Sequence, residues 1–161
     1  MKRLIIIPVI VLLSSVFLLA TSHSEPDYYT PFFMERAELE RSVSWQDKPR
    51  EMSDPGKIYV KDDLIFVNER YSGIHVIDNS IPADPKQVAF IVAPGCIDIA
   101  VKGDIIYLDN AVDLVAFDMN AKKVTERIKG LFPEHHSPDG AWGSYHDRPE
   151  GYILVGWRKN R

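Results

Sequence analysis

The stretch VKDDLIFVNERYSGIHVID, residues 60–78, decides the fold, because the chain carries a second copy of its pattern, VKGDIIYLDNAVDLVAFD, at residues 101–118. The copies begin about forty residues apart, so each repeat unit has room for four short strands. These strands are rich in Ile, Val, Phe and Tyr and are separated by Gly, Asp, Asn and Pro. A period near forty residues with four strands per unit is typical of a β-propeller blade. We therefore predict an all-β, β-propeller-like fold with about two four-stranded repeats, at residues 56–95 and 96–130, and one remnant strand.

The pattern also predicts where the strands end. Asp78 and Asp118 close the third strand of each copy, where a carboxylate can accept hydrogen bonds from the backbone of the next turn. Pro82 and Pro85 then keep the connection out of the sheet, because proline has no N–H to donate. The apolar runs LIF and IIYL indicate strands buried on both faces. In the first repeat we expect four strands: KIYV (57–60), LIFVN (64–68), GIHVID (73–78) and KQVAFIV (86–92).

Individual polar residues are interpreted within this all-β fold. Cys96 is the only cysteine, so no intrachain disulfide can form, and its alternating apolar surroundings favour a buried side chain over a reactive thiol. Asp62, Asp63 and Asp104 lie where hairpin turns are expected, and their spacing is not that of a calcium-binding loop. His75 lies within a strand and is expected on a solvated or half-buried face.

The N-terminal segment indicates export. Lys2 and Arg3 precede an apolar run, Leu4–Ala20, and small and polar residues follow it, which is the pattern of a secretory signal peptide over residues 1–22. The alternative is an uncleaved N-terminal membrane anchor, for which this run is short. No cysteine follows the run, so lipid attachment is not expected there. The expected location is the periplasm, the cell surface or the extracellular space.

We interpret residues 23–55 as a linker that contains one short helix. The segment PFFMERAELERS, residues 31–42, predicts the helix, since Pro31 suits a first turn and apolar residues recur at helical spacing. Its charged residues are expected on the solvated side of the helix. Beyond the helix we expect an extended connector, in which Trp45 serves as a packing anchor.

The two copies resemble the LVIVD-repeat proteins of bacterial envelopes. The segment GIHVIDNSIPADP is similar to the core of that repeat, a strand that ends in an aspartate and is followed by a Ser-x-Pro-x-x-Pro-like turn. The resemblance covers about residues 31–119; the second copy, LVAFDMNAKK, keeps the strand and Asp118 but lacks both prolines. It implies a β-propeller-like fold in a secreted or surface-attached protein, and it implies no catalytic residue.

Members of that family are usually much longer and often carry a lipoprotein cysteine, which this chain lacks. A closed propeller uses about four to eight blades, whereas two repeats leave open sheet edges. Three explanations follow. The chain is a truncated member, or it closes a ring by self-association, or it folds as a compact two-unit β domain.

Residues 131–161 are predicted to form a C-terminal loop and strand. A long loop, residues 129–150, precedes the strand GYILVGW at 151–157, and loops of that length are usually functional or disordered. Together with Tyr152 and Trp157, its aromatic residues would line a sugar-binding or peptide-binding surface or would pack the last strand. The histidine spacing does not match a zinc site, so no metal site is predicted. The candidate binding residues are His135, His136, Trp142, Tyr145 and His146.

Composition and motifs narrow the function. The formal net charge is −4, and loss of the basic N-terminus makes it more negative, so nucleic acid is not an expected partner. No nucleophile elbow or phosphate-binding loop is present, and we predict neither a catalytic residue nor a cofactor. The expected function is binding or scaffolding toward an extracellular or envelope protein or a glycan, with membrane contact only through an uncleaved N-terminus. The alternatives are a propeller-type hydrolase or lyase fragment, or a truncated member without a function of its own.

Overall fold

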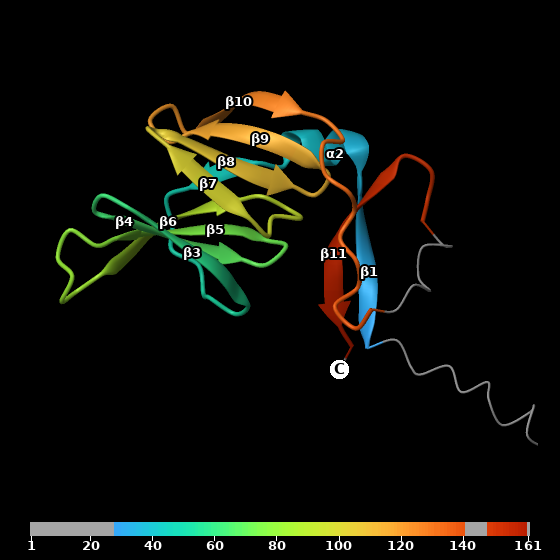
Figure 1. Ribbon diagram of the computed structural model, residues 1–161, viewed down its shortest axis with the longest axis horizontal. Helices are drawn as coiled ribbons and strands as arrows, with labels where there is room; N and C mark the ends of the chain where they lie inside the picture. The colour runs from blue at the N-terminus through green and yellow to red at the C-terminus, as the bar shows by residue number, and fades with distance from the viewer. Residues whose placement is uncertain (1–27, 141–147, 161) are drawn as a thin grey trace, which may run out of the picture.

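The computed structural model describes residues 28–140 and 148–160 (Figure 1). Within these residues, strands β1 to β11 form three antiparallel sheets, none of which is closed, and one short helix, α2, follows β1. We call these the first sheet (order β2-β6-β5-β4-β3), the second sheet (order β10-β9-β8-β7) and the terminal ribbon (β1 with β11). The all-β class is therefore confirmed, whereas three open sheets do not make a closed propeller ring.

The predicted signal peptide, residues 1–22, lies outside the described residues. In the part of the chain that the structure describes, no helix is long and apolar enough to cross a membrane.

The first sheet is an antiparallel meander made by the four predicted strands of the first repeat, so that prediction is confirmed. A fifth strand, β2, pairs with β6 at the outer edge and lies in the segment expected to be a connector. The strands are β2 (Ser44–Gln46), β3 (Pro55–Lys61), β4 (Leu64–Glu69), β5 (Gly73–Asp78) and β6 (Lys86–Val92).

The second sheet repeats the meander with four strands. They are β7 (Ile99–Lys102), β8 (Ile105–Asn110), β9 (Asp113–Asp118) and β10 (Lys123–Ile128). Each strand pairs with its neighbour along the chain, and Figure 1 shows this sheet lying over the first one.

The same carboxylate closes the third strand of both meanders. The Asp78 Oδ1 atom accepts a hydrogen bond from the Ser80 backbone N–H at 2.9 Å. The Asp118 Oδ1 atom accepts one from the Asn120 N–H at 2.8 Å. The role predicted for both aspartates is therefore confirmed. The Ser80 bond also lowers the pKa of Asp78 below its usual value, because it stabilises the carboxylate.

A second pair of backbone bonds occupies matching positions in the two meanders. The Asn79 N–H donates to the Asp63 carbonyl at 2.7 Å, and the Met119 N–H donates to the Asp104 carbonyl at 3.0 Å. Asp63 and Asp104 both lie in the tight turns between the first two strands of their sheets, as predicted. The correspondence of the two sequence copies thus extends to the hydrogen bonds of their turns.

The main core lies between the first and second sheets. Phe66 and Ile74 from the first sheet meet Ile106 and Phe117 from the second, and all four are fully buried. Trp45 stacks on Phe117 with 6.4 Å between the ring centroids, which confirms its expected role as an anchor. Cys96 is fully buried in this core, as predicted, and burial raises the pKa of its thiol well above its usual value.

The terminal ribbon corrects the predicted helix. Residues Tyr29–Glu35 form strand β1, which pairs antiparallel with β11 (Tyr152–Lys159), and α2 is confined to Arg36–Arg41. The helical prediction for 31–35 was wrong because a partner strand distant in sequence supplies the hydrogen bonds. Pro31 is tolerated because, among the described residues, the ribbon has two strands and β1 keeps an unpaired edge. The predicted last strand is confirmed, and it is paired with β1.

Helix α2 is fixed to the second sheet by a buried carboxylate. Asp113 accepts two hydrogen bonds from the Arg36 guanidinium, at 3.0 and 2.8 Å, and one from Arg127 at 2.7 Å. The Gly130 backbone N–H donates a fourth at 2.9 Å. Burial by itself raises the pKa of Asp113, but these bonds outweigh it and hold the pKa below its usual value.

Two burial predictions were wrong. His75 is fully buried instead of solvated or half-buried, because its ring bonds to Glu69 at 3.1 Å and to Gln87 and packs edge-on against Phe90. The run IIYL was expected to be buried on both faces, yet Tyr107 is 38% exposed. Within the described part of the chain, one face of the second sheet therefore remains open.

Candidate binding pocket

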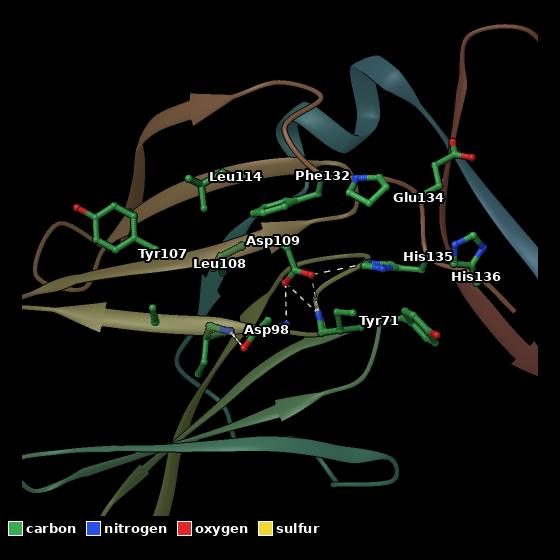
Figure 2. Close-up of a pocket in the computed structure, with 14 residues that line it drawn as sticks. Tyr71, Asp98, Tyr107, Leu108, Asp109, Leu114, Phe132, Glu134, His135 and His136 are labelled. Carbon is green, nitrogen blue, oxygen red and sulfur yellow. Dashed lines mark hydrogen bonds and ion pairs between the residues drawn. The ribbon is translucent and has the colours of Figure 1, made fainter. Parts of the chain in front are cut away.

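A pocket of about 610 Å³ lies against the open face of the second sheet (Figure 2). Ala100, Tyr107 and Leu114 form its floor, on β7, β8 and β9. They alternate along these strands with residues that point into the core, so the floor lies on the face of the second sheet that is turned away from the core. Its volume falls within the range of about 300–1,000 Å³ that is usual for ligand pockets.

The segment after β10 forms one wall of the pocket. Phe132 lies beside Leu114 in Figure 2, and its backbone N–H donates to the Val112 carbonyl at 2.9 Å. The His135 carbonyl accepts a hydrogen bond from the Trp157 indole N–H at 2.9 Å. These bonds tie the segment to the second sheet at one end and to β11 at the other, so the wall is held in place.

A buried carboxylate closes one end of the pocket. Asp109 is 7% exposed and accepts hydrogen bonds from the Ile97 N–H at 3.0 Å and the Asp98 N–H at 2.9 Å. Burial outweighs these bonds and raises the pKa of Asp109. The His135 Nε2 atom lies 3.7 Å from Asp109 Oδ2 and 3.2 Å from the carbonyl oxygen of Gly95. This end is polar, and the floor is apolar.

Two of the candidate binding residues line this pocket. His135 and His136 stand at its rim, as Figure 2 shows. The other three, Trp142, Tyr145 and His146, lie outside the described residues.

The two aromatic residues of the last strand differ from each other. Trp157 is 5% exposed and packs the strand, which was the second of the two alternatives. Tyr152 is 38% exposed and is not among the pocket residues.

The arrangement suits an apolar or aromatic group better than a metal ion. Among the described residues, no three His, Cys, Asp or Glu side chains come together as a ligand set. The floor offers carbon atoms, and polar groups are confined to the rim, which is the composition typical of pockets that bind apolar groups. Asp109 and His135 hold the polar end of the pocket through their contacts with the backbone.

Sequence reasoning missed the floor of this pocket. Ala100 aligns with Tyr59 of the first copy; on the same face but outside the pocket lining, Ala116 beside Tyr107 aligns with Val76. The smaller residues leave space on the second sheet where the first sheet has bulk. That size difference between the aligned copies is the signal that could have located the pocket.

The scan against protein families finds no model that matches the chain, and neither a curated protein nor a solved structure matches it.

Proposed function

We propose that the chain is an exported β-propeller-like repeat protein that works as a binding module and receives an apolar side chain of a partner protein in the pocket on the second sheet. The observation that carries this proposal is the exposed apolar floor of Ala100, Tyr107 and Leu114 in a sheet whose other face packs on the core. Exposed apolar surface of this kind marks interaction sites in soluble proteins. Export is supported by the pattern of residues 1–22.

The blade-like interpretation is supported by three features. The first sheet contains a four-stranded antiparallel meander and the second sheet is one, the two meanders follow each other along the chain, and they share turn bonds at aligned positions. Sheets of this kind are stacked side by side in propellers, where each blade covers the face of the next one. An open stack of two such sheets has binding faces that a closed ring would bury.

The competing class is an enzyme, and one observation favours it. Asp109 has a raised pKa and lies close to His135 in a pocket, which is a frequent property of acid–base pairs. However, the Asp109 oxygens accept bonds from two backbone N–H groups of this chain, and the His135 ring lies within bonding distance of a backbone carbonyl. These groups hold the loop before β7 and the segment after β10, which supports a structural role.

The test is a titration with indole, an isolated aromatic side-chain analogue, followed by NMR. We expect shifts at Ala100 and Leu114 and a dissociation constant of about 1 mM, or about −4 kcal/mol. Ala100→Trp fills the floor and should abolish the shifts at Leu114. Ala121→Trp places the same group in the exposed turn before β10 and is the matched control. Indole that shifts neither residue, or that binds Ala100→Trp as well as the parent, would refute the proposal.

The same titration separates the enzyme alternative. Asp109→Asn keeps the shape of the side chain and its main acceptor oxygen but removes the charge. A binding module should bind indole with unchanged affinity in this variant, within about twofold. A catalytic carboxylate would instead reveal itself by a turnover that the parent shows and the variant lacks.

A further inference from the structure

The contact between the first and second sheets is not symmetric. The first sheet packs through the face that carries Tyr59 and Phe66, which are paired across β3 and β4. The second sheet packs through the face that carries Ile106 and Phe117, paired across β8 and β9. We call the face that carries Tyr59 and Phe66, or the residues aligned with them, the front face of a sheet. The face that carries Ile106 and Phe117, or the residues aligned with them, is its back face. Inside the molecule, the front of the first sheet lies on the back of the second sheet.

In the part of the chain that the structure describes, no other sheet packs on the front face of the second sheet. Ala100 and Tyr107 stand there at the positions that Tyr59 and Phe66 occupy in the first sheet, with the same cross-strand pairing. Tyr107 is 38% exposed, whereas Phe66 is fully buried. This front face is the floor of the binding pocket.

Among the described residues, the back face of the first sheet is uncovered along its edge strand β3. Ile58, Val60 and Ile65 stand there at the positions of Ile99, Val101 and Ile106 in the second sheet. Ile58 is 66% exposed and Val60 is 61% exposed. Their counterparts Ile99 and Val101 pack against the core. The molecule therefore exposes one front face and one back face, and both are the counterparts of surfaces that it already packs together.

The wall of the pocket does not block this front face. The Phe132 N–H donates to the Val112 carbonyl at 2.9 Å, and the Ala93 N–H donates to the Ser72 carbonyl at 3.0 Å; the two acceptors, Val112 and Ser72, are aligned in the two copies. Residues 131–136 thus take the same place beside the second sheet that the link between the two sheets takes beside the first sheet. That link leaves room for the second sheet to pack on the first. Within the described residues, neither strand of the terminal ribbon lines the pocket.

We propose that the partner is a second copy of this chain, whose back face of the first sheet packs on the front face of the second sheet. This inference rests on the proposed function and names the partner that fills the pocket. Ile58 and Val60 supply the protruding side chains, and the hollow at Ala100 receives them. Because the two faces differ, the contact is head to tail, so it produces a closed ring or an open filament instead of a symmetric dimer.

The test uses two variants that each place a charge on one of the two faces. Each variant is purified from the cells that produce it, without further truncation. Val60→Glu damages the back face, and Tyr107→Glu damages the front face. Both positions are exposed, so each variant should keep its circular dichroism spectrum. Ile81→Glu is the matched control, since Ile81 lies in the loop before β6 and is 59% exposed, close to the 61% of Val60.

Light scattering after size exclusion should give the parent and Ile81→Glu a mass of at least two chains. Each face variant alone should be monomeric, with association weakened about a hundredfold or more because a charge is buried without a partner. An equimolar mixture of Val60→Glu and Tyr107→Glu should give a dimer and nothing larger, because one intact front face and one intact back face remain.

Three results would overturn the second copy as partner: a monomeric parent at about 1 mM, a mixture that stays monomeric, or a dimer that survives one face variant. The last outcome would indicate a symmetric contact. The indole titration of Val60→Glu keeps the two proposals apart, because this variant retains the pocket. If indole binds there while the parent is monomeric, the pocket stands and takes another partner. If it does not bind, the proposed function fails as well.

Discussion

The substitution Asp113→Ala tests how the helix and the terminal ribbon are fixed to the second sheet. The Asp113 carboxylate is fully buried and accepts hydrogen bonds from Arg36, Arg127 and the Gly130 N–H. Alanine removes the carboxylate, so the guanidinium groups of Arg36 and Arg127 lose this hydrogen-bond acceptor. The side chain of Arg127 is 11% exposed and that of Arg36 is 26% exposed, so water only partly replaces the lost bonds.

The expected cost follows from this partial burial. Removing one partner of a fully buried ion pair costs about 3–5 kcal/mol. Because Arg36 is about one quarter exposed, we lower the expectation to about 2–4 kcal/mol of unfolding free energy. Asp84→Ala is the matched control, since the pair of Asp84 with Lys86 is about two-thirds exposed on both sides. It should cost at most about 1 kcal/mol.

The assay is urea unfolding at pH 7 with tryptophan fluorescence, because Trp45 is partly buried and stacks on Phe117 of the core. The midpoint should fall strongly for Asp113→Ala and little for Asp84→Ala, at an unchanged denaturant slope. Equal midpoints for the two variants would refute the assignment of this network as the tie between α2 and the second sheet.

Three further predictions concern the backbone, the thiol and pH. Gly95→Ala should lower the free energy of unfolding in urea more than Gly103→Ala does. A Cβ at position 95, where φ is +82°, would lie 2.6 Å from the Ala111 backbone, whereas a Cβ at position 103 meets nothing within 4 Å. Equal losses for the two variants would contradict this packing. Cys96 should react with a disulfide reagent only after unfolding, and rapid reaction of the native protein would show that it is not buried. The pKa of Asp113 is lowered by folding, so its contribution is complete above the unfolded pKa of about 3.9 and is lost as pH falls through the lower folded value. The difference in unfolding free energy between the parent and Asp113→Ala should therefore be constant from about pH 7 to about pH 5 and should narrow below about pH 4. A difference that widens below about pH 4 would mean that folding raises the pKa of Asp113.

Local patterns were sufficient to predict the strands of the first repeat. In β5, apolar residues end at Asp78, and the carboxylate bonds the next turn as its chemistry suggests. Turns and strand ends depend on neighbours in sequence, so the residues themselves carry the information. The burial of Cys96 was predictable for the same reason, from its apolar surroundings.

Long-range pairing was not predictable in this way. The segment Tyr29–Glu35 has helical spacing of its apolar residues, yet it forms a strand because β11 pairs with it from the other end of the chain. His75 was misplaced for a related reason. Its burial depends on Glu69 and Gln87, which satisfy its ring from neighbouring strands. Such partners become visible only when strand order is known.

The pocket was predicted only in part. His135 and His136 were selected from their loop, and both reach the rim. The floor combines β7, β8 and β9, and its hollow arises from Ala100 where the first copy has Tyr59. Alignment of the two copies reveals the size difference, but only the sheet register shows that it lies on an uncovered face.

The central claim is that the open front face receives the open back face of another copy. The most direct measurement is the set of NOEs between methyl groups of two differently labelled chains. Leucine methyls are labelled in Val60→Glu, which keeps the front face, and isoleucine methyls in Tyr107→Glu, which keeps the back face. The account predicts intermolecular NOEs between Leu114 of the first chain and Ile58 of the second. NOEs from Leu114 to other isoleucines, with none to Ile58, would contradict it.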